Sequence, residues 1–210
     1  MVLKIEKKLN TSLIMIDYNK EQEKILEKIK SRSKFEKNKG SWNKFNGNLT
    51  LRVIKYFLNR HFKGRVKGPN VFISNYPAEI DLILTKENTK CDLFTGEYPA
   101  KETLIIFEVK ARGYFSQKDP EKIKEKFDNL NKEFPHIKCV YLSVSEVCNP
   151  KRKTSINYGK QIKKALKHKY PVFILQDSRT KEIYYGEWGK LIDYIKRVIG
   201  KSYEEGRGIN

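Results

Sequence analysis

Two stretches of sequence, Asn75-Tyr-Pro-Ala-Glu-Ile-Asp-Leu-Ile-Leu84 and Leu104-Ile-Ile-Phe-Glu-Val-Lys-Ala-Arg112, place charged residues inside apolar runs. Each run has the length and the apolar composition of a buried β-strand. Charged side chains are rarely buried in such strands without a partner or a bound metal ion. The two stretches therefore predict central strands whose charged residues take part in a functional site.

The charged residues of these stretches follow the alternation of a strand. Residues two apart in a strand lie on the same face, so Glu79 and Asp81 point the same way, and so do Glu108 and Lys110. If the two strands are neighbours, three carboxylates and one ammonium group converge on a small patch. This combination is typical of a divalent-metal site with a lysine beside it.

The ligand chemistry of this patch suits Mg²⁺, with Mn²⁺ as the alternative ion, because both ions accept hard oxygen ligands. Asp81 and Glu108 would supply carboxylates, and the main-chain carbonyl of Val109 a third oxygen. A bound ion would stabilise charge on a phosphate and activate a water molecule, which Lys110 would orient. A solvated ion pair on an exposed sheet face is the competing interpretation of Glu-x-Lys. The apolar flanks of both motifs favour the metal site.

The positive charge of the chain is large and unevenly distributed. The 210 residues carry a formal net charge of +19 and have a pI near 9.7. Residues 28–78 contain 13 Lys or Arg and one acid, residues 79–108 seven acids and three lysines, and residues 148–176 eight Lys or Arg and no acid. An acidic centre between two basic stretches fits a metal site flanked by phosphate-binding surfaces. A lysine-rich composition from a thermophilic or AT-rich source is the alternative. It would explain many of the lysines, but it explains less readily why the two flanking stretches carry almost no acids.

The combination of Asp81 with Glu108-Val109-Lys110 resembles the motif of the PD-(D/E)xK nucleases. The resemblance covers about residues 47–141, and archaeal Holliday junction resolvases and the small nucleases of archaeal spindle-shaped viruses are the most similar members. It implies a restriction-endonuclease-like α/β fold, with a mixed central β-sheet flanked by helices. It also implies that Asp81 and Glu108 bind metal while Lys110 assists the attacking water.

One position departs from the pattern of many members, which carry a further Glu on a helix before the first strand, within Gly-x-x-x-Glu-Arg. The similar stretch here is Gly47-Asn-Leu-Thr-Leu-Arg52, which has Leu51 at the position of that Glu. Glu79 is the favoured replacement and is included among the expected catalytic residues. Glu36 is an alternative replacement, and a weakened site is the third possibility.

Basic residues outside the motif are the expected contacts to nucleic-acid phosphates. They are Arg52, Arg112, Lys151, Arg152, Lys153, Lys160, Lys163, Lys164 and Lys167. Trp42 is added to this set because it lies among lysines and aromatic residues in residues 31–47, which are expected to form a loop. Such a segment suits single-stranded or branched DNA, or the aromatic residues only anchor the loop to the core.

Apolar periodicity predicts helices and strands in alternation along the rest of the chain. Helices are expected at about 49–62, 119–134, 157–168 and 187–199, and strands at about 71–74, 78–84, 103–110, 137–143 and 172–176. This order predicts a mixed sheet between helices. The chain is divided into residues 1–46, an N-terminal helix and basic loop packing on the core, residues 47–200, the nuclease core, and residues 201–210, a disordered tail.

These features together predict a Mg-dependent deoxyribonuclease that hydrolyses phosphodiester bonds and selects branched or duplex DNA by its structure. Symmetric cutting of a junction would need a homodimer. The C-terminal helix with Trp188 and Tyr194 either forms its interface or covers the sheet. A sequence-specific restriction-type endonuclease and a non-catalytic nucleic-acid-binding protein with a decayed site are the alternatives.

The remaining composition argues against other classes of protein. Three cysteines without Cys-x-x-Cys spacing indicate neither a disulfide framework nor a zinc site. No apolar run approaches the roughly 18 residues of a membrane span, and the first residues lack the apolar core of a signal peptide. We therefore expect no membrane partner and a cytoplasmic location, which is the host cytoplasm if the protein is viral.

Overall fold

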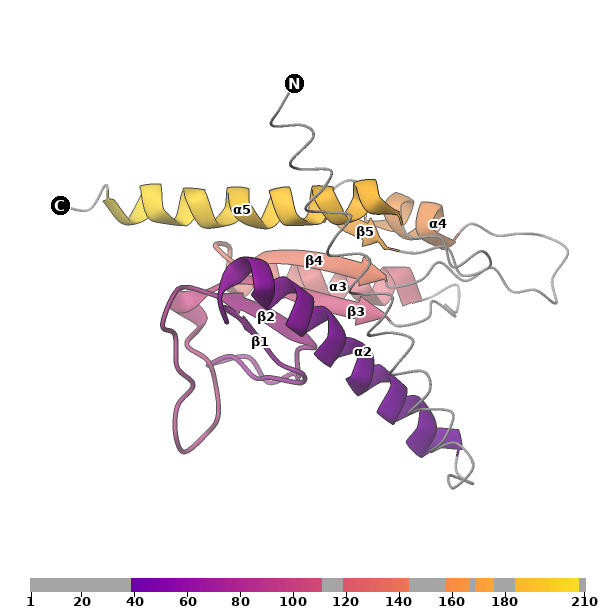
Figure 1. Cartoon of the computed structure of the whole chain (residues 1–210), viewed down its shortest axis with the longest axis horizontal. Helices are drawn as coiled ribbons and strands as arrows, with labels where there is room; N and C mark the ends of the chain where they lie inside the picture. The colour runs from indigo at the N-terminus through magenta and orange to yellow at the C-terminus, as the bar shows by residue number, and fades with distance from the viewer. Residues whose placement is uncertain (1–38, 111–118, 144–157, 167–168, 176–183, 208–210) are drawn as a thin grey trace, which may run out of the picture.

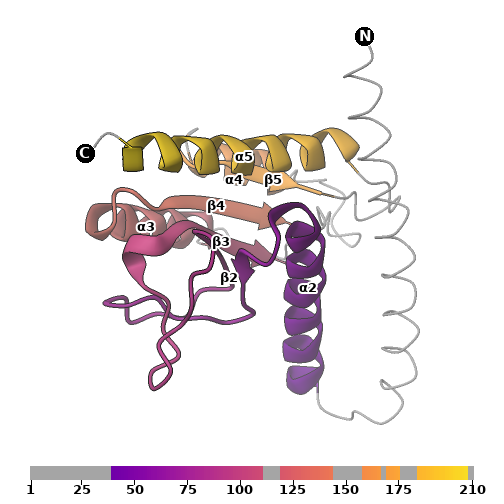
Figure 2. The same cartoon turned by 60° about the vertical axis from the view of Figure 1, so that its left-hand side comes forward.

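One mixed β-sheet organises the molecule, with helices on both of its faces (Figures 1 and 2). The computed structural model describes residues 39–110, 119–143, 158–166, 169–175 and 184–207. The strands are β1 (Val66–Lys67), β2 (Leu82–Thr85), β3 (Thr103–Lys110), β4 (Lys138–Ser143) and β5 (Val172–Ile174), and they lie in the order β1-β2-β3-β4-β5. The pairs β1–β2 and β2–β3 are antiparallel, whereas β3–β4 and β4–β5 are parallel. This arrangement confirms the predicted α/β fold.

Alternation along β3 divides the core into two layers. Ile105, Phe107 and Val109 face a cluster formed with helices α2 (Lys39–Phe62) and α5 (Tyr185–Arg207). Ile106, between them, belongs to a second cluster formed with α3 (Asp119–Glu133) and α4 (Tyr158–Ala165). Because both faces of the sheet are covered, the apolar runs of the central strands are buried throughout.

Helix α2 is attached to the edge of the sheet by polar side chains as well as by its apolar stripe. The side-chain amide of Asn59 donates to the carbonyl of Val66 at 3.0 Å, and its oxygen accepts from the N–H of the same residue at 2.8 Å. The ammonium of Lys55 donates to the carbonyl of Gly68 at 2.6 Å. Backbone groups at the edge of the sheet are thus hydrogen-bonded to side chains of α2. These bonds hold α2 beside the start of β2.

The helix α2 begins at Lys39, so the prediction of a loop over 31–47 is wrong for residues 39–47, and Trp42 lies in a helix. Gly40 and Gly47 lower helix propensity by only about 1 kcal/mol each relative to Ala. No proline interrupts the stretch, and packing of its later turns outweighs that cost. Residues 31–38 lie outside the described part of the chain.

The predicted strand at 71–74 forms only isolated bridges, from Val71 to Ile80 and from Ile73 to Tyr98. Asn70 and Asn75 have φ angles of 56° and 66° and end the extended backbone on either side. The strand predicted at 78–84 begins instead at Leu82, since the residues before it pair with the 70–71 segment. The two-residue strand β1 was not predicted.

The predicted disordered tail is helical over residues 201–207, because α5 continues to Arg207. The hydroxyl of Ser202 donates to the carbonyl of Ile199 at 2.8 Å within this helix. Trp188 is buried and Tyr194 packs against the same cluster, so this face of α5 covers the sheet. Helices α2 and α5 run across the expected divisions at 46/47 and 200/201. No helix in the described part of the chain is long and apolar enough to cross a membrane.

Candidate active site

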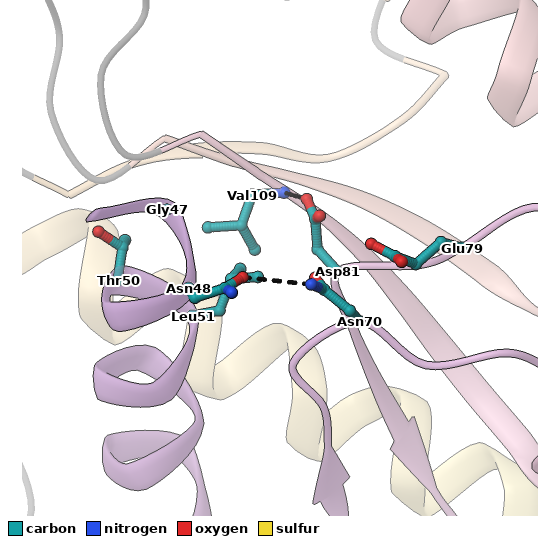
Figure 3. A pocket seen from close by; sticks show the side chains of 8 residues that line it. All are labelled: Gly47, Asn48, Thr50, Leu51, Asn70, Glu79, Asp81 and Val109. Atoms are coloured by element: carbon teal, nitrogen blue, oxygen red, sulfur yellow. Dashed lines mark hydrogen bonds between the residues drawn. The ribbon is translucent and has the colours of Figure 1, made fainter. Parts of the chain in front are cut away.

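Asp81 and Glu108 occupy neighbouring positions where β2 begins. The register pairs Leu82 with Phe107, so Asp81, the residue before β2, stands opposite Glu108. Oδ2 of Asp81 accepts a hydrogen bond from the N–H of Val109 at 2.7 Å (Figure 3). The side chain of Asp81 thus takes the place of a strand carbonyl in the ladder. Acidic residues 27 positions apart in sequence thus lie close enough for their charges to interact.

A cavity of about 250 Å³ opens beside Asp81 (Figure 3). It is lined by Gly47, Asn48, Thr50, Leu51, Asn70, Glu79, Asp81 and Val109. The amide of Asn70 donates to Oδ1 of Asn48 at 3.2 Å and joins the loop wall to the α2 wall. Leu51, at the position of the expected helix Glu, is 5% exposed and lies in this wall. The departure from the motif therefore falls inside the site.

Each oxygen of the Glu108 carboxylate accepts a hydrogen bond from a different lysine. The ammonium of Lys110, on the same strand, lies 2.5 Å from Oε1, and that of Lys126, on α3, lies 2.7 Å from Oε2. The side chain of Glu108 is only 11% exposed. A carboxylate this far from water is stable as an anion only with such partners.

The pKa values of the two carboxyl groups are shifted in opposite directions. Burial raises the pKa of Asp81, and the negative charge of Glu108 raises it further, against the hydrogen bond from Val109. Burial also acts to raise the pKa of Glu108, but the ammonium groups of Lys110 and Lys126 outweigh it and hold this pKa below its ordinary value. The folded protein therefore favours the anionic form of Glu108 and disfavours that of Asp81.

Lys126 was not predicted as a site residue. Its pKa is raised: burial alone would lower it, but the charges of Glu108 and Asp81 prevail. The signal available in the sequence is its position on α3, three residues after Ile123 and four before Leu130, on the buried stripe of the helix. A lysine within an apolar stripe indicates a buried acidic partner.

Gly68 is a second residue whose importance the sequence did not reveal. Its φ is +130°, and a Cβ there would lie 2.5 Å from Cδ2 of Leu82 and 2.8 Å from the carbonyl oxygen of Asp81. Only glycine fits this conformation and this close approach. Gly68 therefore allows the loop to pass directly over the backbone that carries Asp81.

The oxygens at this site fit a divalent ion. The N–H and C=O of one strand residue point to the same side, so the carbonyl of Val109 faces the side of Asp81. Two carboxylates and one carbonyl are hard ligands of the kind Mg²⁺ and Mn²⁺ accept. Glu79 lines the same cavity as Asp81, but among the described residues no three acidic, His or Cys side chains are placed to hold one ion. Both Glu79 and Asp81 precede β2, and the role of Glu79 as a third carboxylate stays a prediction.

The expected nucleic-acid contacts are spread over the molecule. Arg52 is exposed on α2, next to Leu51 of the cavity wall. Lys163 and Lys164 are exposed on α4, where the ammonium of Lys163 lies 3.7 Å from the carboxylate of Glu187. Lys160 belongs to α4 and Trp42 to α2. Arg112, Lys151, Arg152, Lys153 and Lys167 lie outside the described residues.

Comparison with known proteins identifies the fold. No family model and no curated protein matches the sequence. Among solved structures, NucC of P. aeruginosa ATCC27853 in its cAAA-bound form matches with a TM-score of 0.54 and 14% identity, over 94% of this chain and 98% of that chain. The fold is restriction-endonuclease-like. NucC of E. coli MS115-1 in its apo form matches with a TM-score of 0.47 and 13% identity, over 73% of this chain and 89% of that chain.

Proposed function

We propose that this protein is a divalent-metal-dependent endonuclease that hydrolyses phosphodiester bonds in DNA. The observation that carries the proposal is the placement of Asp81 opposite Glu108, with the ammonium of Lys110 2.5 Å from Glu108. This trio has the composition and the strand positions of the PD-(D/E)xK motif. The NucC neighbour is an endonuclease of that type, so the shared fold supports the same class of reaction.

Asp81, Glu108 and the carbonyl of Val109 would hold Mg²⁺ or Mn²⁺. The bound ion would polarise the scissile phosphate and lower the pKa of a water molecule. The N–H of Val109 fixes the orientation of Asp81, and Lys110 provides a positive charge on the strand that carries Glu108. The half-buried position of the carboxylates strengthens each of these electrostatic interactions relative to water.

The substrate we propose is DNA, in branched or duplex form, cut according to its structure as Holliday junction resolvases do. The net charge of +19 favours a polyanion, and Arg52 places a guanidinium next to the cavity wall. Phosphate contacts of this kind provide affinity without reading bases. We also propose that the protein acts in the cytoplasm as a homodimer, which cuts two DNA strands.

The test is cleavage of a labelled four-way junction beside a linear duplex of matched sequence, with Mg²⁺ or Mn²⁺. Wild type, Asp81→Ala and the control Glu87→Gln, which changes an exposed acid outside the site, are compared. We expect preferential cutting of the junction by wild type and the control, and none by Asp81→Ala. A fixed cut site in linear DNA would identify a restriction-type enzyme. Tight binding of both substrates without any cutting would refute an endonuclease and leave a DNA-binding protein.

A further inference from the structure

The two lysines on Glu108 differ in how they are held. Lys110 belongs to the same strand and its side chain is 40% exposed, whereas that of Lys126 is 29% exposed and comes from α3. The neighbours of Lys126 on its helix face, Ile123, Phe127 and Leu130, are buried in the core. The stem of Lys126 is thus confined by packing, and its ammonium is directed at Oε2 of Glu108.

We propose that Lys126 is a built-in counter-cation of the Asp81–Glu108 pair, which competes with the divalent ion and keeps ion affinity low until DNA binds. This inference rests on the proposed metal site. It assigns to Lys126 a control of ion occupancy that is separate from any action of Lys110 on the reacting phosphate.

The electrostatic argument starts from the protein without an ion. Asp81 and Glu108 stand at neighbouring positions, and two partly buried anions so placed repel each other unless a cation lies nearby. The ammonium of Lys126, 2.7 Å from Glu108, offsets that repulsion. A divalent ion at the pair brings two further positive charges close to the same ammonium. Repulsion between them then weakens ion binding.

A DNA phosphate would change this balance. It adds negative charge at the site. This charge compensates the combined positive charge of the ion and the ammonium of Lys126. The ion and DNA should therefore bind cooperatively, and by linkage each should raise the affinity for the other by the same factor. Without the charge of Lys126, the ion should bind tightly even in the absence of DNA.

The test is Mn²⁺ binding by the full chain, followed by the electron paramagnetic resonance signal of free Mn²⁺, with and without a DNA duplex. Lys126→Met removes the charge and retains the stem, and Lys126→Arg retains the charge. Lys124→Met is the control, because Lys124 lies on the same helix and pairs with Asp128 instead. If Lys126→Met does not fold, Lys126→Gln replaces it.

We expect Lys126→Met to lower the Kd for Mn²⁺ without DNA on the order of tenfold, as loss of one nearby unit charge predicts. Lys126→Arg should stay within about threefold of wild type, and Lys124→Met should match wild type. DNA should lower the Kd of wild type more than that of Lys126→Met. The variant should also melt at a lower temperature without Mn²⁺ and recover when Mn²⁺ is added, because the ion replaces the missing cation.

A Kd for Lys126→Met equal to or higher than that of wild type would overturn the proposal, since a merely structural lysine would give that result. Failure of both wild type and Lys126→Met to bind Mn²⁺ would overturn this proposal together with the proposed metal site. The expected order of Kd values without any cleavage of DNA would refute the nuclease alone and leave the role of Lys126 standing.

Discussion

Two carboxylates beside helix α3, Glu108 on β3 and Asp128 on the helix itself, each pair with two lysine ammonium groups. The side chain of Glu108 is 11% exposed and that of Asp128 is 30% exposed. Glu108 faces a second carboxylate, Asp81, whereas the further partner of Asp128 is the hydroxyl of Tyr170 at 2.6 Å. Both carboxylates thus have two lysine partners, but Glu108 is also repelled by a neighbouring anion, whereas Asp128 receives a further hydrogen bond.

The Asp128 cluster has the properties of a structural clamp. Hydrogen bonds from Lys124, Lys169 and Tyr170 hold the pKa of Asp128 far below its ordinary value. Lys169 and Tyr170 follow α4, so the cluster joins α3 to the segment that leads into β5. No residue of this cluster lines the cavity beside Asp81.

The difference between the clusters separates function from stability. At the Asp128 clamp the lowered pKa of Asp128 means that its charge is favourable in the folded protein. At the other cluster the pKa of Asp81 is raised by burial and by Glu108, which means that its charge is unfavourable in the folded protein. Unfavourable charges retained in a cavity are typical of groups that bind a ligand.

The largest effect is expected for Asp81→Asn. Loss of a metal ligand should reduce the cleavage rate by more than about 100-fold. The free energy of unfolding at neutral pH should rise, because an acid with a raised pKa destabilises the folded state when it is ionised. Cleavage assays and urea denaturation measure the two effects. Asp128→Asn is the matched control, and should retain cleavage while losing stability. Equal losses of stability in both variants would remove the distinction between the clusters.

Leu51→Glu would add a third carboxylate to the cavity wall. Because Leu51 is 5% exposed and lies near Asp81 in that wall, the variant should lose about 2–3 kcal/mol of unfolding free energy without a divalent ion. Mn²⁺ should restore part of that loss, as a ligand that binds only the folded state does. Thermal melting with increasing Mn²⁺ measures this recovery. Leu51→Gln, which is polar but uncharged, should show the loss with little recovery; equal recovery in both variants would contradict a metal site at this wall.

The sequence predicted the central elements because their signals are local. Strand β3 has its predicted bounds, Thr103–Lys110, since apolar residues on both faces mark a central strand. Asp119-Pro120 at the beginning and Pro135 after the end likewise marked helix α3. The contact of Lys126 with Glu108 spans 18 residues and depends on how α3 docks against the sheet. Docking of one element on another leaves only an indirect trace in the sequence.

The irregular segment before β2 was the least predictable part of the site. Its apolar residues indicated regular strands, but the left-handed backbone of Asn70 and Asn75 limits them to single bridges. Asparagine tolerates this conformation without requiring it. The position of Glu79 relative to Glu108 depends on this segment, so the sequence alone could not place the third carboxylate of the predicted site.

The pH dependence of stability should distinguish the clamp from the site. Because the pKa of Asp128 is lowered, its ionised form stabilises the folded state at pH values above 3.8, the ordinary pKa of an aspartate carboxyl, and this contribution is lost as the pH falls below that value. Asp128→Asn should therefore lower the unfolding free energy by about 1 kcal/mol at pH ~7. The difference between variant and wild type should shrink below pH ~4. Urea denaturation at about pH 7 and about pH 3 measures both values, and an equal difference at the two would refute the assigned role of the charge.

The smallest effect is expected for Tyr170→Phe, which removes only the hydroxyl that donates to Oδ1 of Asp128. The ring stays in its edge-to-face contact with Phe127, at a centroid distance of 5.1 Å, so packing should be retained. One hydrogen bond to a charged group should cost about 1 kcal/mol or less in a site that keeps two lysines. Combined with Asp128→Asn, the loss should be less than additive, because both changes remove the same bond. Combined with Asp81→Asn, the two effects should add, since the residues belong to separate clusters. Additivity in the first pair, measured by urea denaturation, would show that Tyr170 and Asp128 do not act as one unit.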